Sequence, residues 1–290
     1  MFEAIPSPYL VPFDNSFKIK DFDTSPSKNG LSKHDCKKRL TELSLSLSDL
    51  QRVLYANTKY SILLIFQAMD TAGKDSTIRA VMDSVDPNGC EVHSFQKPSI
   101  EELKHDFLWR TAGKLPPFGR MGIFNRSYYE EVLIVKVHPH FLQQQKIDKK
   151  EIDQSFWQNR YESILDHEKH LARNNTIVLK FWLNISKKEQ KRRFLSRIDE
   201  PQKNWKFSKD DITERQHWKE YMHAYEDAIS ISSKPWAPWY AIPADQKPFM
   251  RMCVADIIVA TLRSLGLNYP RLGPNEYKAF KSMRELLENE

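Results

Sequence analysis

The sequence has 290 residues, with 44 Lys and Arg against 38 Asp and Glu, a net charge of +6 and a pI near 9.0. This length suits a single α/β domain with one sizeable core. The positive balance favours a polyanionic partner, such as nucleic acid, polyphosphate or a membrane surface, without choosing among them. Cys36, Cys90 and Cys253 are odd in number and form no CxxC pair. We therefore expect a reducing compartment and no disulfide framework.

The sequence shows neither a recognisable signal peptide nor a membrane span. The opening residues lack the basic segment and apolar core of a signal peptide, and no apolar run reaches transmembrane length. We therefore expect a cytoplasmic protein that does not enter a membrane.

Residues 1–30 are rich in proline, serine and charge without a period, so we expect an arm lying over a domain of residues 31–270. Residues 271–290 are expected to be a C-terminal tail.

An apolar stripe runs along residues 31–57, with steps of three and four that predict one helix. Its members are Cys36, Leu40, Leu43, Leu47, Leu50 and Leu54. Packing of this stripe on a sheet is the preferred interpretation. The seam of a coiled-coil dimer is the alternative.

The stretch of residues 60–81 predicts a phosphate-binding loop. Residues 62–66 are all apolar, as in a strand buried on both faces of a parallel sheet. A loop containing Gly73 and Lys74 follows, and residues 76–85 can then be helical. In a P-loop of this layout, backbone N–H groups and the positive helix end face the phosphate, and the lysine adds a full charge. The expected phosphate contacts are Ala72, Gly73, Lys74, Asp75 and Ser76.

The match to G-x-x-x-x-G-K-[ST] is incomplete. Ala68 replaces the first glycine, and Asp75 stands where the motif has a hydroxyl residue. An ordinary strand-to-helix turn with a surface lysine is therefore the alternative to a phosphate site.

Strands and helices are predicted to alternate along the rest of the chain. The predicted strands are residues 90–95, 120–124, 176–185 and 239–243, and the predicted helices are residues 99–110, 128–137, 156–172, 186–197, 210–231 and 249–265. This alternation predicts a three-layer α/β fold, with a central, mainly parallel sheet covered by helices on both faces.

Polar side chains next to the predicted strands are candidates for phosphoryl-transfer chemistry. Asp70 lies inside the loop, where an anion makes sense if it holds Mg²⁺ through water or orients the attacking oxygen. Asn125 and Arg126 directly follow a strand, at the end where open α/β sheets bind ligands. Asn125 can offer a metal only a carbonyl oxygen. Glu130 lies four residues after Arg126, so a simple helix ion pair is the alternative to a functional role.

Residues 187–197 are crowded with lysine and arginine. A charge run alone is usually a solvated helix face. Here it follows a core strand and precedes a segment interrupted by proline and asparagine, as the lid of a nucleoside-monophosphate-kinase-like fold does. We therefore expect a lid over approximately residues 190–215, which closes on phosphate and excludes water. The cations expected to bind phosphate there are Arg193, Arg197, Lys203 and Lys206.

Five motifs occur in an order that resembles the polyphosphate kinase 2 family. They are QAMDTAGKD, SFQKPSIEELKHDFLWR, FNRSYYEEVLIVKVHP, NWKFSKDDITERQHW and WAPWYAIPA. They are similar in particular to the class III branch, whose members phosphorylate both AMP and ADP. The resemblance implies a P-loop kinase-like fold with a helical lid, Mg²⁺ as cofactor with Mn²⁺ as a substitute, and polyphosphate, AMP, ADP and ATP as partners. We also expect a homo-oligomer, either a dimer or a tetramer.

The resemblance also implies roles for individual residues. The catalytic residues are expected to be Asp70, Lys74, Asn125, Arg126 and Glu130, and the metal ligands Asp70, Asn125 and Glu130. Other branches carry Asp at the position of Asn125, so the missing charge is expected to come from Glu130. The acceptor nucleotide is expected near Phe95, Lys97, Asp106 and Arg110.

Two other functions compete with direct in-line transfer from polyphosphate. A P-loop nucleoside monophosphate kinase that uses ATP as donor needs a fuller glycine loop and a hydroxyl at the position of Asp75. A nucleic-acid-binding protein needs basic residues interleaved with exposed aromatic residues, and this chain has no such motif.

Overall fold

A computed structural model describes residues 2–27, 30–271 and 273–290, without the side chains of residues 206 and 209. Its centre is a five-stranded sheet in which every neighbouring pair is parallel. In spatial order the strands are β2 (Cys90–Ser94), β3 (Met121–Asn125), β1 (Ser61–Gln67), β4 (Thr176–Asn184) and β5 (Trp239–Pro243). Every residue of β1, β4 and β5 is buried. The five predicted strands are confirmed, each within about one residue at either end.

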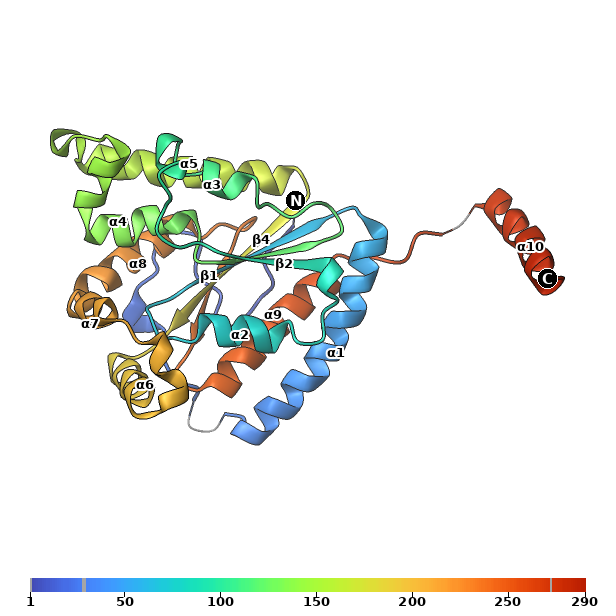
Figure 1. Ribbon diagram of the computed structural model, residues 1–290, viewed down its shortest axis with the longest axis horizontal. Helices are drawn as coiled ribbons and strands as arrows, with labels where there is room; N and C mark the ends of the chain where they lie inside the picture. Colours follow the sequence, from blue (N-terminus) through green and yellow to red (C-terminus); the bar gives the residue numbers. More distant parts are fainter. Residues whose placement is uncertain (1, 28–29, 272) are drawn as a thin grey trace.

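Helices cover both faces of the sheet, which confirms the three-layer fold (Figure 1). One layer contains α1 (Lys33–Asn57), α2 (Lys74–Val81) and α9 (Lys247–Ser264). The other contains α3 (Trp109–Ala112), α4 (Ile134–Val137), α5 (Gln154–Arg173) and α8 (Trp218–Ser232). The helices α6 (Lys187–Asp199) and α7 (Lys209–Gln216) lie at the end toward which β4 points, joined by the 3₁₀ segment Pro201–Lys206.

The apolar stripe of α1 is buried inside the monomer. Cys36, Leu43, Leu47 and Leu54 are each at most 1% exposed. The helix packs along α9 in the same layer, and its buried side chains belong to the core cluster that includes the residues of the sheet. Since these side chains are already covered, the stripe cannot also be the seam of a coiled-coil dimer.

The chain ends behave differently from each other. The N-terminal arm lies along β5: Val11 N donates to Trp239 O at 3.0 Å, and Ala241 N donates to Tyr9 O at 2.8 Å. This pairing covers a sheet edge that would otherwise expose backbone hydrogen-bonding groups. The segment expected to be a tail contains the helix α10 (Pro274–Glu288), which has no buried residue and lies apart from the body in Figure 1.

Three predicted helices are broken. Residues 99–110 contain only a 3₁₀ turn (Glu102–Lys104) and α3, although the capping box at Ser99 forms. Residues 128–137 begin as a 3₁₀ segment (Tyr128–Val132), and residues 210–231 divide at His217. In the second case the adjacent Tyr128 and Tyr129 are both buried and both donate to Glu168 in the core. Tertiary contacts therefore override the helical pattern there.

Two further structural facts bear on the environment of the protein. Cys36, Cys90 and Cys253 are all free thiols. Across the described ranges, no helix combines the length and apolarity that crossing a bilayer requires.

Candidate functional site

The residues predicted to carry chemistry meet at the carboxyl ends of β1 and β3. These strands are neighbours, and Phe66 lies beside Asn125 in their register. The P-loop follows β1, while Arg126 follows β3 and donates its N–H to Phe66 O at 3.0 Å. Two stretches far apart in sequence are thereby joined at the edge where open α/β sheets bind ligands.

The loop itself has an unusual backbone. Gly73 has a φ of +105°, which glycine adopts without strain, and it is the N-cap of α2. Thr71 and Arg126 adopt φ values of +65° and +64° without being glycine. Strained residues of this kind are common at ligand sites. The helix α2 begins at Lys74, earlier than predicted, and no side chain caps its first turn. Its first N–H groups can therefore face an anion.

Lys74 is only 8% exposed. Its Nζ donates to Ala68 O at 2.7 Å. An ammonium group has three N–H donors, and the other two have no acceptor among the residues that the structure describes. Burial, followed by the charge of Arg126, lowers the pKa of Lys74, while Asp70, Glu130 and Asp75 oppose the shift. A buried cation with open donors thus lies at the start of α2.

Paired polar side chains surround this lysine. Arg126 Nη2 donates to Asp70 Oδ1 at 2.9 Å, and Asn125 Nδ2 donates to Asp75 Oδ1 at 2.7 Å. The charges of Glu130 and Asp70 raise the pKa of Arg126 despite its burial. Glu130 forms no ion pair with Arg126 among the described contacts. Its Oε1 instead accepts from Gln67 Nε2 at 2.9 Å, so the simple helix pair is absent.

The three expected metal ligands are Asp70, Asn125 and Glu130. Each of them bonds to a different side chain, and no group of three His, Cys, Asp or Glu residues suited to a metal occurs in residues 2–27, 30–271 or 273–290. Two carboxylates and an amide oxygen nevertheless fit Mg²⁺, which usually binds one or two carboxylates and completes its shell with water and substrate phosphates. The donor set therefore fits a metal that arrives with phosphate.

Helix α6 holds the P-loop by its backbone carbonyls. Gln190 Nε2 donates to Asp70 O at 3.0 Å. Arg193 Nη1 donates to Ala72 O at 2.6 Å and to Thr71 O at 3.2 Å. The Arg193 guanidinium also bonds to Ala244 O and to Glu189. Arg193 was expected to contact phosphate, but in this structure its donors hold the loop.

Two other cations expected to bind phosphate form ion pairs within the segment of residues 190–215. Arg197 Nη1 donates to Asp211 Oδ2 at 3.1 Å, and Lys203 Nζ lies 2.5 Å from Glu200 Oε2. Burial and the charge of Asp70 raise the pKa of Asp211. The side chain of Lys206 lies outside the described residues. Arg197 and Lys203 must therefore give up these carboxylate partners if they are to bind a polyanion.

The expected nucleotide residues cluster only in part. The Arg110 guanidinium lies 5.4 Å from the ring centroid of Phe95, and its Nη2 donates to Gln96 O at 2.9 Å. Asp106 caps a local turn by accepting from Leu108 N. Lys97 is exposed in the segment after β2. Of the four residues expected near the nucleotide, the structure thus brings Phe95 and Arg110 into contact.

Sequence reasoning missed Gln67 and Gln190. Gln67 is fully buried at the end of β1, and a polar residue closing an apolar strand is a signal that could have identified it. Gln190 binds the loop from a position 120 residues away and also accepts from Arg215. No local pattern predicts such a contact.

Comparisons with known proteins agree with this geometry. The family model for polyphosphate kinase 2 matches residues 30–266. An ADP-polyphosphate phosphotransferase of Rhodopseudomonas palustris is 53% identical, covering 83% of this chain and 84% of its own length. An AMP/ADP-polyphosphate phosphotransferase of Meiothermus ruber is 42% identical, with coverage of 91% and 95%.

A solved structure leads to the same family. The crystal structure of polyphosphate kinase 2 from Arthrobacter aurescens TC1 has a TM-score of 0.86 and 34% sequence identity, covering 98% of both chains. This chain therefore belongs to the polyphosphate kinase 2 family.

Proposed function

We propose that this protein transfers the terminal phosphate of inorganic polyphosphate to adenine nucleotides, converting AMP to ADP and ADP to ATP. The observation that carries the proposal is Lys74, a buried ammonium with two open donors at the uncapped start of α2, in a member of the polyphosphate kinase 2 family. Such a group supplies what phosphoryl transfer needs most, which is a positioned positive charge on the transferring phosphate.

The neighbouring residues have complementary roles in this proposal. Residues 72–76 bind phosphate through backbone N–H groups, and Arg126 neutralises charge that develops on the transferring group. Asp70, Asn125 and Glu130 hold Mg²⁺, for which Mn²⁺ can substitute. When bound, the metal would supply positive charge that neutralises phosphate. Asp70 orients the attacking oxygen of the acceptor phosphate, which displaces the shortened polyphosphate in line without a phosphoenzyme.

The range of acceptors is the finer part of the proposal. The R. palustris relative is named for ADP alone, whereas the M. ruber relative is named for both AMP and ADP. We place the acceptor beside Phe95 and Arg110, with Lys97 and Asp106 in the same segment. AMP presents its phosphate at a shallower depth than ADP, so Glu130 would have a larger gap to fill with the metal and water that it holds. Glu130→Ala is therefore expected to reduce the AMP reaction more than the ADP reaction, and equal losses would contradict this role of Glu130.

A donor and acceptor assay tests the function. Purified protein with Mg²⁺ is given either polyphosphate or ATP as sole donor, with AMP or ADP as acceptor, and products are separated by chromatography. We expect ADP and then ATP to form from AMP and polyphosphate, and chelation of the metal to stop both steps. Turnover with ATP but none with polyphosphate would instead favour the nucleoside monophosphate kinase. The homo-oligomer remains a prediction, which light scattering on the purified chain tests.

A further inference from the structure

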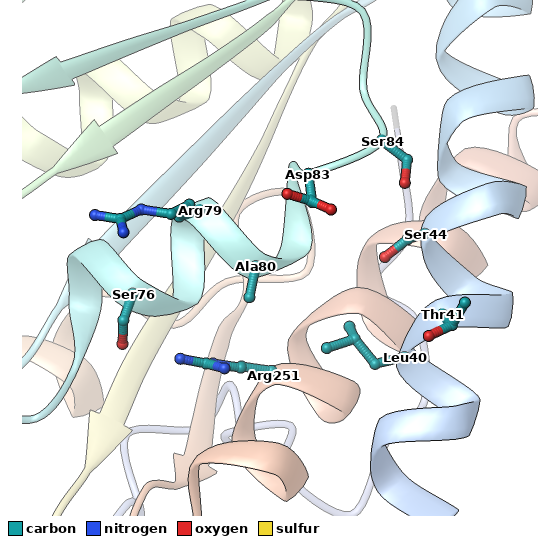
Figure 2. Close-up of a pocket in the computed structure, with 9 residues that line it drawn as sticks. All are labelled: Leu40, Thr41, Ser44, Ser76, Arg79, Ala80, Asp83, Ser84 and Arg251. Carbon is teal, nitrogen blue, oxygen red and sulfur yellow. The ribbon is translucent and has the colours of Figure 1, made fainter.

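A pocket lies in the angle between α1, α2 and α9, beside the helix that follows the P-loop. Its volume is about 380 Å³, and its polar lining comes from all three helices (Figure 2). Thr41 and Ser44 project from α1, Ser76 and Arg79 from α2, and Arg251 from α9. None of these residues except Ser76 belongs to the site described above.

The pocket carries positive charge that the protein does not neutralise. Arg251 Nε is buried without a hydrogen-bond partner. Within the described part of the chain, no carboxylate forms an ion pair with Arg79, with Arg251 or with Lys247, which lies one turn before Arg251 on α9. Burial lowers the pKa of Arg251, and the charges of Arg193 and Arg79 lower it further. Burial and the charges of Arg193 and Arg251 likewise lower the pKa of Lys247. These cations repel one another, and a bound polyanion would relieve that repulsion.

The pocket is continuous with the P-loop. Ser76 lies in the first turn of α2, and its Oγ donates to Gly73 O at 3.1 Å. Both guanidinium groups, of Arg79 and Arg251, extend toward the end of α2 that carries Ser76, whereas Asp83 lies at the opposite end of the helix (Figure 2). Cations therefore line the mouth nearest Lys74, and a carboxylate marks the far end.

We infer that this pocket binds the tail of the polyphosphate donor, beyond the phosphates held by the P-loop. The inference rests on the proposed function. A chain of linked phosphates carries charge along its whole length, so the part leaving Lys74 needs further cations. The adjacent pocket offers the guanidinium groups of Arg79 and Arg251 and the hydroxyl of Ser76. A guanidinium binds phosphate oxygens through paired N–H groups, which suits the unpartnered Arg251. The carboxylate of Asp83 repels phosphate and limits how far the tail extends along α2.

The test compares donors of two lengths. Tripolyphosphate fills the P-loop and leaves little tail, whereas long-chain polyphosphate reaches the pocket. Arg251→Gln keeps a long polar side chain but removes the charge. We expect this change to raise the KM for long-chain polyphosphate about tenfold, the usual scale of one charge-assisted hydrogen bond, with little change in kcat or in the KM for tripolyphosphate.

Arg52→Ala is the matched control, because Arg52 is an exposed cation on α1 outside the pocket and its loss changes the net charge equally. It should leave both KM values unchanged. Calorimetric titration of long-chain polyphosphate, without nucleotide, should show the same order of affinities as the KM values.

Equal effects of Arg251→Gln on both donors, or no effect on either, would overturn the tail site while leaving the proposed function intact. Equal weakening by Arg52→Ala would also overturn the tail site, because it would show that the effect depends on net charge alone. A wild-type protein that neither binds nor uses polyphosphate of any length would overturn the proposed function, and the tail site with it.

Discussion

Two buried lysines show how this fold separates function from stability. Lys180, at the centre of β4, is fully buried, and its Nζ donates to Glu168 Oε2 at 2.5 Å, Ser232 O at 2.8 Å and Tyr129 Oη at 3.0 Å. All three donors of its ammonium are used by the protein. Lys74 is almost as buried, but its one described acceptor is Ala68 O. Both residues are buried, and they differ in what their ammonium hydrogens bind.

The two lysines also differ in whether nearby carboxylates form ion pairs with them. Burial lowers the pKa of Lys180 to about 8, against the attraction of Glu168. Glu168 also accepts from Tyr128 and Tyr129, so this polar network is closed. The carboxylates near Lys74 bond to Arg126, Gln67 and Asn125, and none of them forms an ion pair with it in the described part of the chain. A buried lysine without an ion-pair partner is a candidate anion-binding residue.

The largest expected effect is the loss of turnover in Lys74→Met. Removing the charge on the transferring phosphate should lower kcat/KM with polyphosphate by two to four powers of ten, which is about 3 to 5 kcal/mol. The melting temperature should stay the same or rise, because the mutation removes a buried charge without breaking an ion pair. Steady-state kinetics and thermal unfolding on one preparation give both results. A folded variant with near-normal turnover would place the site elsewhere.

Lys180→Met should show the reverse pattern. It leaves Glu168 buried without its cation, and breaking a buried pair costs about 3 to 5 kcal/mol of unfolding free energy. Turnover per folded molecule, measured well below the melting temperature, should stay close to wild type. The double variant Lys180→Met with Glu168→Leu should regain part of the stability. A loss of unfolding free energy below about 1 kcal/mol in denaturant titrations, the scale of a surface ion pair, would contradict the structural role of Lys180.

A smaller effect is expected for Arg193→Ala, where the loop rather than the phosphate loses a partner. Leaving the carbonyls of Thr71 and Ala72 unbonded should cost about 1 to 3 kcal/mol of stability and reduce kcat/KM about tenfold through a displaced loop. Arg192→Ala is the control, since Arg192 is exposed and binds the same Glu189. If Arg193→Ala loses turnover at an unchanged melting temperature, Arg193 acts on phosphate directly.

The smallest effect is a pH dependence. Burial and Arg126 lower the pKa of Lys74, so the free enzyme loses that proton below the ordinary lysine value of 10.5. Bound phosphate favours the charged form and raises the pKa again. The alkaline decline of kcat/KM should therefore begin at a lower pH than the decline of kcat. Profiles of both parameters with polyphosphate check this, and coincident declines would show that another group titrates.

The sequence predicted the region around Lys74 better than the region around Lys180. A glycine–lysine loop between an apolar strand and a helix is a local pattern, and it led to Lys74 and Asp70. Arg126 was identified from its place directly after a second predicted strand. The five strands were also predictable, because buried parallel strands are continuous apolar runs. The broken helix at Tyr128 was not predictable, because its cause is a carboxylate 40 residues away.

The same limit applies to the basic helix α6. Its arginines were recognisable as a basic helix, but the pattern could not show that Arg193 donates to carbonyls 121 and 122 residues away. Charge in a sequence shows which residues can bind an anion. Only the packed structure shows which of their donors remain open.

The most direct test is the binding of tripolyphosphate, without acceptor, to wild type, Lys74→Met and Lys180→Met. Isothermal titration calorimetry at low salt measures all three affinities, and this short donor does not reach the pocket behind α2. The open donors of Lys74 predict binding at least about tenfold weaker in Lys74→Met and unchanged in folded Lys180→Met, in line with the loss of a charge-assisted hydrogen bond. Equal affinity of wild type and Lys74→Met would contradict the assignment of Lys74 as the lysine that holds the donor phosphate.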